Sequence, residues 1–280
     1  MLQDMAAGRL ENEFQNITAC DGDIMLCFRE GQVLICRGAD DSLTLPTLGL
    51  MSHWEQTAEP QYLFRLQEQN YFLWTGKPPA SPDQGFAYEP VRQLRQLQSK
   101  EVCFGVMTGW HLYNWYRVNR FCGCCGTPTE PDTKERMLRC PNCGNMIFPR
   151  ISPAVIVAVT DGDRLLLSKY AGRAYTRYAL LAGYTEIGET IEQTVEREVL
   201  EEVGLHVKNL RYYKSQPWGV DGNVLMGFFC DVDGSTQIHI DETELAMADW
   251  YPRDALPAQD DGISLTREMI RVFEAGNEPR

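Results

Sequence analysis

GYTEIGETIEQTVEREVLEEVGL, residues 183–205, carries seven glutamates and one arginine in twenty-three positions. Three of these glutamates, Glu198, Glu201 and Glu202, lie within five consecutive residues. On a helix, like charges three or four residues apart repel one another by about 0.2–0.5 kcal/mol per pair. The stretch is therefore either a solvated acidic helix face, which is what most charge runs are, or a metal site whose cations offset the repulsion.

Local signals predict a helix with defined ends in this stretch. Thr190 followed by Gln193 matches a capping box, so the helix should begin at about residue 191, and Gly204 is well placed to end it. At about 100° per residue, four apolar residues share one stripe: Ile191, Val195, Val199 and Val203. The three clustered glutamates fall in an adjoining arc, so the helix can pack on a sheet while its carboxylates face the edge of one cleft.

The chemistry of these carboxylates favours a particular kind of metal. Hard oxygen ligands at this density suit Mg2+ or Mn2+ rather than zinc. Gly183 follows an expected strand, where a nearby backbone carbonyl such as that of Ala182 would join the ligands. Arg197 stands between carboxylates and is expected to orient one of them through a bidentate hydrogen bond.

Four of the ten cysteines form a second motif. Cys122 and Cys125, then Cys140 and Cys143, are two CxxC pairs separated by fourteen residues, which is the spacing of a zinc ribbon. Four thiolates complete the coordination of a zinc ion, so we expect one structural zinc per chain. The role of Cys124, inside the first pair, stays open between a spectator and a residue that exchanges with a neighbour on oxidation.

Composition argues against some classes of protein. The 280 residues carry a net charge of −13, which speaks against a general nucleic-acid binder because such proteins show a basic surface. A negatively charged substrate is compatible with this charge, since a bound divalent cation inverts the local field. No apolar run is long enough to span a bilayer, and the N-terminus has no signal-peptide pattern. We therefore expect no membrane association and a cytoplasmic location.

Strand and helix patterns predict an α/β (α+β) fold in several parts. We expect an N-terminal β-rich domain at 1–90, a helical connection at 91–120, the four-cysteine zinc ribbon at 121–150 and a catalytic domain at 151–280, with 77–89 as the best linker candidate. The expected strands cover residues 24–30, 31–38, 61–66, 71–76, 154–159, 164–170, 178–184, 211–218, 224–232 and 236–240. The expected helices cover residues 91–101, 106–119, 191–203 and 265–276.

The glutamate stretch resembles the signature of a known family. Gly183, Glu189 and the run 197–205 are similar at every defined position to the Nudix box, GX5EX7REUXEEXGU with U apolar. The zinc ribbon before it and SQPW at 215–218 after it resemble the NADH pyrophosphatase (NAD diphosphatase) branch of the Nudix hydrolases. The resemblance implies a Nudix α/β/α sandwich with a mixed sheet, preceded by the ribbon and by a smaller, mainly β N-terminal domain.

The resemblance also implies an activity. It points to a homodimeric enzyme that uses two or three Mg2+ or Mn2+ ions to hydrolyse the pyrophosphate bond of NAD(H) to AMP and nicotinamide mononucleotide, and to remove NAD caps from RNA 5′ ends. The alternative is a Nudix hydrolase of other nucleoside diphosphate derivatives such as ADP-ribose. A non-catalytic RNA-binding module is a third hypothesis, against which the intact box and the net charge of −13 both weigh.

Individual residues receive roles from the same resemblance. The metal ligands that it implies are the Ala182 carbonyl, Glu198, Glu202 and Glu244, with Glu201 completing the box. The substrate-binding residues that it implies are Glu135, Phe148, Tyr184, Gln216, Pro217, Trp218 and Asn223. Tyr184 and Trp218 match aromatic positions around the nicotinamide ring, and Phe148 matches one near the adenine. Either Glu201 or Glu244 would accept the proton of the attacking water, and the sequence does not choose between them.

The chain departs from this branch after Trp218. The usual motif continues SQPWPFPxS, whereas here it runs SQPWGVDGNVLM, so both later prolines are absent and Asn223 is the nearest counterpart of the terminal serine. Because proline fixes φ, we expect a looser segment, which bears on the preference for the nicotinamide ring and for NADH over NAD+.

Overall fold

The computed structural model describes residues 1–4, 9–37, 43–51, 54, 59–76, 85–96, 100–172, 176–257 and 262–279. The chain divides into two compact units. The C-terminal unit comprises Met1, Ile151–Trp218 and Asn223–Arg280, and the N-terminal unit comprises Leu2–Arg150 and Gly219–Gly222. The four-domain division suggested by the sequence is finer than these units and stays a prediction. Within the described ranges, none of the helices has the length and apolar character needed to cross a bilayer.

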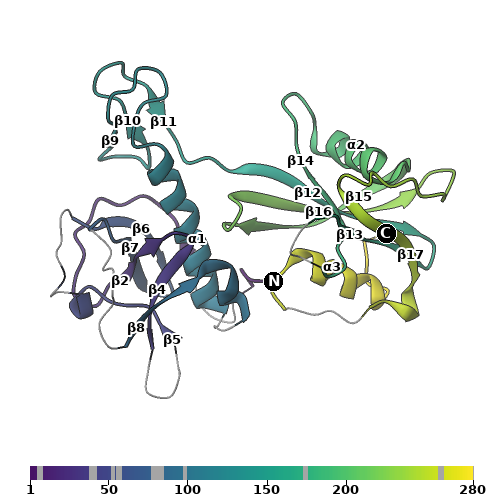
Figure 1. Cartoon of the computed structure of the whole chain (residues 1–280), viewed down its shortest axis with the longest axis horizontal. Coiled ribbons are helices and arrows are strands. Elements are labelled where there is room, and N and C mark those ends of the chain that lie inside the picture. The colour runs from purple at the N-terminus through teal and green to yellow at the C-terminus, as the bar shows by residue number, and fades with distance from the viewer. Residues whose placement is uncertain are drawn as a thin grey trace. The chain divides into compact units, whose positions relative to one another are not determined.

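A six-stranded mixed sheet forms the middle layer of the C-terminal unit (Figure 1). Its order is β15-β16-β12-β13-β17, and β14 pairs with β12 off this path. The strands are β12 (Ser152–Asp161), β13 (Arg164–Tyr170), β14 (Leu181–Tyr184), β15 (Val207–Trp218), β16 (Asn223–Val232) and β17 (Leu245–Pro252). β12 runs parallel to β16 and antiparallel to β14, so its first half lies between these two strands.

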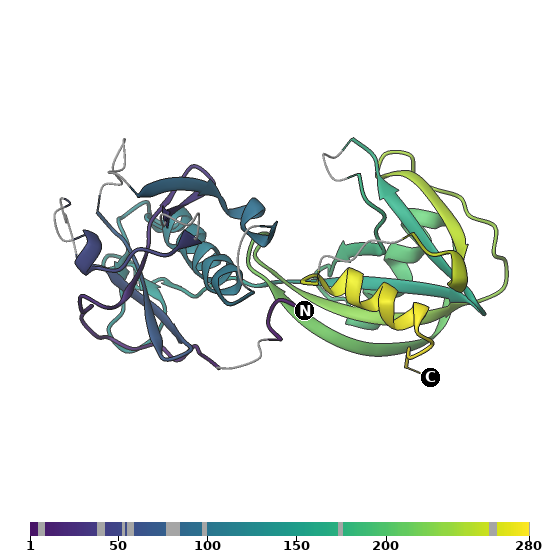
Figure 2. The same ribbon diagram turned by 90° about the horizontal axis from the view of Figure 1, so that it is seen from below.

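Two helices cover opposite faces of this sheet, α2 (Ile191–Val203) and α3 (Leu265–Glu274), as Figures 1 and 2 show. A short 3-10 helix, η3 (Arg253–Ala255), precedes α3. Because side chains alternate along a strand, β12 contributes to both cores. Val155 and Val157 pack on the α2 side, and Ile156 and Ala158 pack on the α3 side. This arrangement confirms the α/β/α sandwich with a mixed sheet.

Before helix α1, the described part of the N-terminal unit contains two small sheets, in agreement with a mainly β region. One has the order β1-β6-β7-β2, with β1 (Leu10–Glu11), β6 (Gln61–Leu66), β7 (Gln69–Leu73) and β2 (Ile24–Leu26). The other has the order β3-β4-β5 with β8 paired to β4, and its strands are β3 (Phe28–Arg29), β4 (Gln32–Arg37), β5 (Leu43–Thr44) and β8 (Phe86–Pro90). Short 3-10 helices lie at Gly49–Met51 (η1) and Val91–Gln96 (η2).

Helix α1 (Lys100–Val118) packs on the sheet that contains β6 and β7. Gly109 allows the close approach, because a Cβ there would lie 2.1 Å from the Leu26 side chain. The ribbon follows α1 as a three-stranded antiparallel sheet in the order β11 (Met146–Ile147), β10 (Leu138–Arg139), β9 (Glu130–Pro131). Strands of this length bury little apolar surface, so the ribbon depends on its cysteine site for stability.

Residues 236–240 do not form the expected strand. Ile238 and Ile240 pack against the core on the α2 side, while the His239 amide donates to the Val203 carbonyl at 2.9 Å. The apolar alternation therefore reflects a segment that covers the core without a strand partner. Conversely, the sequence did not indicate β17, whose alternation between buried and exposed positions is irregular.

The region around residue 90 also differs from expectation. Residues 86–90 form β8 rather than a linker, because they pair with β4, and residues 77–84 lie outside the described part. Within the expected helix at 91–101, η2 covers 91–96, residues 97–99 lie outside the described part, and α1 begins at Lys100.

Candidate active site

The helix that carries the clustered glutamates, α2, has the ends that the sequence predicts. The Thr190 hydroxyl accepts the Gln193 amide at 3.2 Å and the Gln193 side chain accepts the Thr190 amide at 2.9 Å, which completes the capping box. Gly204 ends the helix in the left-handed conformation, with a φ of 69°. The valines of the predicted apolar stripe are fully buried, so the helix is docked on the sheet and its carboxylates lie beside the buried stripe.

Arg197 lies at the centre of the acidic cluster. Its Nε and Nη2 donate to the two carboxylate oxygens of Glu189 at 2.6 and 3.1 Å, which confirms the expected bidentate contact. Its Nη1 donates to Glu198 Oε1 and Glu201 Oε2, each at 2.8 Å. Nη2 also donates to the Tyr184 carbonyl oxygen at 2.9 Å. One guanidinium thus orients three carboxylates and the end of β14.

Glu189 anchors the loop that precedes α2. Besides Arg197, it accepts the Glu186 amide and the Thr194 hydroxyl, each at 3.0 Å. The hydrogen bond from Arg197, supported by the Glu186 amide, lowers the pKa of the Glu189 carboxyl to about 2. Sequence reasoning missed Thr194, which is fully buried. The sequence signal for this residue was its place in the first turn of the helix, next to the apolar stripe, where a threonine side chain is buried and needs a hydrogen-bond partner.

Glu198 and Glu202 are held against strand β14. Glu202 is 2% exposed, and its Oε1 accepts the Ala182 amide at 3.3 Å. Glu198 is 9% exposed and lies so close to Gly183 that a Cβ there would fall 1.8 Å from its carboxyl carbon. A side chain at position 183 would therefore displace the Glu198 carboxylate from its present place. The two carboxylates and the backbone of Ala182, all expected metal ligands, are neighbours in the structure.

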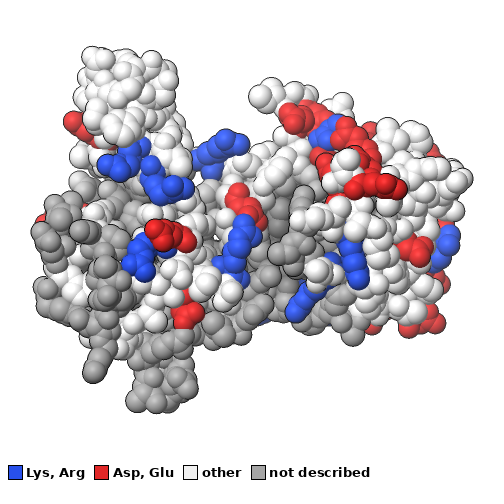
Figure 3. Space-filling view, viewed as in Figure 1, with Lys and Arg blue, Asp and Glu red and all other residues white. Residues whose placement is uncertain are grey.

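The charge around Glu198 suits a bound cation. Burial raises the pKa of the Glu198 carboxyl, Arg197 opposes the rise, and the charges of Glu201 and Glu244 add to it. Glu244, in the turn before β17, is therefore near enough to act on Glu198. Figure 3 shows acidic side chains gathered over α2 and the segment before it. Oxygen donors with excess negative charge fit Mg2+ or Mn2+ by their chemistry.

The glutamates do not form a compact ligand set as they stand. Among the described residues, the ribbon cysteines are the only group of three or more Cys, His, Asp or Glu whose ligand atoms all lie within 4.8 Å of one another. Arg197 holds Glu198 and Glu201, and Glu202 faces the Ala182 amide. Each of these hydrogen bonds uses one oxygen of its carboxylate, so cation binding requires the glutamates to move closer together and does not require them to give up these bonds.

The four expected zinc ligands come together in the ribbon. The Sγ atom of Cys125 lies 3.5 Å from that of Cys140 and 3.6 Å from that of Cys143. The Sγ atoms of Cys122 and Cys143 are also 3.6 Å apart. Tetrahedral zinc with bonds of about 2.3 Å places sulfur atoms about 3.8 Å apart, so these separations fit a zinc site. Cys124 is exposed and outside this set, and its amide donates to the Cys122 sulfur at 3.4 Å.

Tyr184 and Asn223 meet on the sheet face opposite to α2. Tyr184 pairs with Ala154 of β12, and Ala154 pairs with Leu225 of β16, so these side chains and that of Asn223 share one face. Leu225 packs in the core on the α3 side, which identifies the face. The Asn223 Nδ2 donates to the Tyr184 hydroxyl at 3.3 Å. Two of the expected substrate-binding residues are therefore hydrogen-bonded to each other.

The SQPW run forms the end of β15. Gln216 is fully buried, donates to the Ile263 carbonyl at 2.8 Å and accepts the Leu265 amide at 2.7 Å. Its amide thus holds the start of α3, and a contact of Gln216 with the substrate stays a prediction. Pro217 is exposed, and Trp218 is partly buried and pairs with Asn223. Residues 219–222, which stand in place of the two prolines, form a compact turn.

Glu135 and Phe148 belong to the ribbon in the N-terminal unit. The Glu135 amide donates to the Asp132 carboxylate at 3.1 Å, while the side chain of Glu135 is exposed. Phe148 is 52% exposed, so its ring is accessible to a ligand. Their contacts with a substrate stay predictions.

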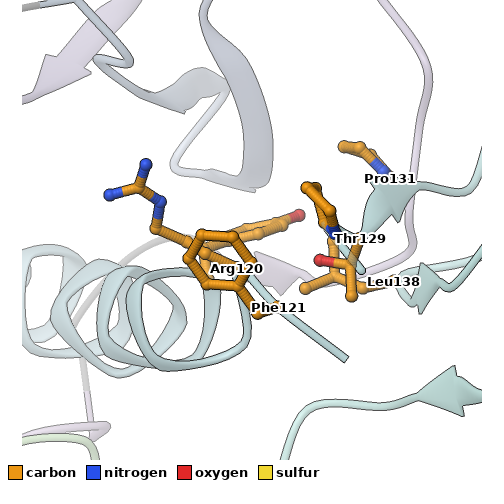
Figure 4. A pocket seen from close by; sticks show the side chains of 7 residues that line it. Arg120, Phe121, Thr129, Pro131 and Leu138 are labelled. Carbon is orange, nitrogen blue, oxygen red and sulfur yellow. The ribbon is translucent and has the colours of Figure 1, made fainter. Parts of the chain in front are cut away.

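Two cavities lie away from these residues. One, of about 340 Å³, lies where the end of α1 meets the ribbon, and Figure 4 shows Arg120, Phe121 and Leu138 among the residues that line it. The other, of about 700 Å³, is lined by residues including Thr160, which stands about 20 Å along β12 from Ala154 at about 3.3 Å per residue. Neither cavity includes a residue assigned above to the substrate or to the catalytic metal, so neither is the candidate active site.

Known proteins match both motifs. Residues 150–273 match the NUDIX domain, and residues 117–148 match the NADH pyrophosphatase zinc ribbon domain. The NAD-capped RNA hydrolase NudC of Pseudomonas aeruginosa (strain LESB58) is 37% identical over 228 residues, which are 80% of this chain and 76% of that protein. The protein of the same name from Salmonella typhi is 40% identical over 162 residues, or 58% of this chain and 63% of that protein. A crystal structure of a Nudix hydrolase from Nitrosomonas europaea aligns with this chain at 22% sequence identity and a TM-score of 0.49. The alignment covers 55% of this chain and 90% of that protein's chain.

Each domain match contains one of the two motifs. The glutamate helix lies within the NUDIX match, and the four cysteines lie within the zinc ribbon match. Fold and site together define a hydrolase of the Nudix class. More narrowly, the chain belongs to the NADH pyrophosphatase family of Nudix hydrolases, which carries a zinc ribbon.

Proposed function

We propose that this protein hydrolyses the pyrophosphate bond of NAD(H) to AMP and nicotinamide mononucleotide and removes NAD caps from RNA. The observation that carries the proposal is the occurrence of the arginine-held glutamate helix and the zinc ribbon in one chain, which is 37% identical to a protein named NAD-capped RNA hydrolase NudC. Two or three Mg2+ or Mn2+ ions, when bound, would screen the charge of the pyrophosphate and activate the attacking water.

The residues of the chain supply position and charge. Glu198 and Glu202 are the proposed ligands, and their contacts with Gly183 and Ala182 place them at the end of β14. Arg197 limits the rotation of Glu198 by a hydrogen bond of 2.8 Å. A pyrophosphate approaching a protein of net charge −13 is repelled, so the acidic cluster binds its substrate only after cations have neutralised it.

Glu244 is our proposal for the group that accepts the proton of the attacking water. Glu201, the other candidate, already binds Arg197 through one oxygen at 2.8 Å. The Glu244 carboxylate is exposed, has no hydrogen-bond partner in the described ranges, and acts on Glu198 through its charge. A proton acceptor needs a free lone pair, which both carboxylate oxygens of Glu244 offer, whereas one oxygen of Glu201 is engaged by Arg197.

Kinetics on a panel of substrates test the function. NADH, NAD+, ADP-ribose and NAD-capped RNA would be compared with Mg2+ and with Mn2+, and the products identified. Release of nicotinamide mononucleotide from NADH or NAD+ is the expected result. Hydrolysis of ADP-ribose without hydrolysis of the dinucleotides would overturn the proposal in favour of the alternative substrate class. The absence of the two prolines after Trp218 is the reason to test that class.

The Glu202→Gln variant tests the role of the helix. Loss of a ligand to the catalytic metal should lower turnover by about a hundredfold or more, because such ions contribute several kcal/mol to transition-state stabilisation. Glu196→Gln is the matched control, since Glu196 lies exposed on the same helix and has no role in the motif. Circular dichroism should be unchanged in both variants. Near-normal turnover in Glu202→Gln would exclude the proposed metal site.

We further propose that the protein is a homodimer that acts in the cytoplasm. Met146 and Phe148 expose 53% and 52% of their surface on the ribbon, which supports an interface there. All ten cysteines are free of disulfides, as is usual for proteins of reducing compartments. Light scattering tests the first point and cell fractionation the second; a strict monomer would exclude the dimer.

A further inference from the structure

Tyr184 is held at both ends of the residue. Arg197 donates to its carbonyl oxygen at 2.9 Å, and Asn223 donates to its hydroxyl at 3.3 Å. One contact comes from the glutamate helix and the other from the first residue of β16. The side chain nevertheless is 50% exposed. Its ring is therefore fixed in place without being buried.

The register of the strands shows how the ring lies. β12 stands between β14 and β16, and neighbouring strands are about 4.8 Å apart, so at least about 10 Å separate the backbones of Tyr184 and Asn223. The phenol reaches Asn223 only by extending over β12 near Ala154, whose small side chain leaves room. One face of the ring therefore lies toward β12, and the other is available to a planar ligand. Aromatic rings stack favourably on such a surface.

Asn223 is poorly explained by packing alone. It is 7% exposed, and its Oδ1 is buried without a hydrogen-bond partner among the residues that the structure describes. A buried polar atom without a partner lowers stability. In the motif that the chain otherwise resembles, a serine stands at the nearest position, and its shorter side chain would not extend as far toward Tyr184.

We propose that Asn223 is a positioning residue, which holds the phenol of Tyr184 so that its ring forms a fixed stacking surface for the nicotinamide ring of the substrate. The identity of that ring rests on the proposed hydrolysis of NAD(H). Asn223 acts on the substrate through Tyr184 and makes no hydrogen bond to the catalytic carboxylates. It therefore affects the binding of the ring-bearing half of the substrate and leaves the chemical step unchanged.

A double-mutant cycle tests this assignment. Asn223→Ala and Tyr184→Phe each remove the same hydrogen bond and keep the aromatic ring. We expect each to raise KM for NADH roughly tenfold, with kcat changed less than about twofold, because the lost interaction serves binding. The double variant should raise KM no further than either single variant, since changes to one coupled pair do not add. Additive effects on KM, or a loss confined to kcat, would overturn the proposal.

Two comparisons complete the kinetic test. ADP-ribose lacks the nicotinamide ring, so its KM should be the same in the wild type and in the Asn223→Ala variant; an equal rise for both substrates would contradict the proposal. Tyr212→Phe is the matched control, because Tyr212 is a strand tyrosine that is 55% exposed and outside the site. It should behave as the wild type.

A measurement without substrate separates this inference from the proposed function. In protein carrying 13C-labelled tyrosine, the ring signals of Tyr184 are those that vanish in Tyr184→Phe. They should shift in Asn223→Ala, since the ring loses its tether. Unchanged signals would refute the positioning role whatever the substrate is. If these signals shift but the wild type releases no nicotinamide mononucleotide, the positioning role stands and the proposed substrate is wrong.

Stability provides the last check. Asn223→Ala removes both the unpartnered amide oxygen, which favours stability, and the hydrogen bond to Tyr184, which lowers it, so its melting temperature should stay close to that of the wild type. A clear fall in melting temperature with unchanged KM would show that Asn223 serves folding only.

Discussion

Arg197 donates five hydrogen bonds, four to carboxylate oxygens and one to the Tyr184 carbonyl. A planar guanidinium offers five N–H donors in a fixed fork, whereas a lysine offers three from a single nitrogen. The same side chain thus orients Glu189, Glu198 and Glu201, which come from the loop and two turns of the helix. Their positions depend on one another because they depend on one residue.

The Arg197→Lys variant keeps the charge and removes this fork. We expect kcat/KM to fall about 10- to 100-fold, as is typical when a residue that orients metal ligands is changed, and a higher Mg2+ concentration to be needed for half-maximal rate. Arg164→Lys is the control, since Arg164 pairs with Asp161 at the exposed far end of β12. If Arg197→Lys retained most of its activity at low Mg2+, the orienting role would be excluded.

At the scale of elements, α2 depends on its capping box. The Thr190 hydroxyl accepts a hydrogen bond from the Gln193 amide. Loss of this hydrogen bond should lower the stability of the first turn of α2 by about 1 kcal/mol. Hydrogen exchange of the amides at 191–195 measures this directly, and Thr190→Ala should speed their exchange about fivefold. Thr190→Ser keeps the acceptor and should exchange like the wild type. Equal exchange in Thr190→Ala and the wild type would show that the box does not stabilise the helix.

Elements with local signals were predictable from the sequence, and elements that depend on distant partners were not. The caps, the apolar stripe and the cysteine spacing each lie within a short stretch of chain. By contrast, β17 is a strand because β13 pairs with it, and residues 236–240 are not a strand because the His239 amide bonds to the end of α2. The contact of Tyr184 with Asn223 joins residues 39 apart through strand register, so no local pattern could reveal it.

At the scale of the whole molecule, two metal chemistries are assigned to different units. The four cysteine sulfurs lie in the N-terminal unit and the proposed glutamate ligands lie in the C-terminal unit. Zinc prefers the thiolates and Mg2+ prefers the carboxylates, so each ion selects its own site by ligand type. Removal of one metal should therefore leave the other site able to bind.

Metal analysis of cysteine variants tests this separation. The wild type should contain one zinc per chain, and Cys140→Ser should lose it together with thermal stability, because the ribbon strands bury little surface of their own. Cys124→Ser is the matched control: Cys124 is exposed and outside the four-sulfur set, so this variant should retain its zinc. Mg2+ binding to the C-terminal unit, followed by calorimetry, should persist in Cys140→Ser. Loss of zinc in Cys124→Ser but not in Cys140→Ser would show that the ligand set has been assigned incorrectly.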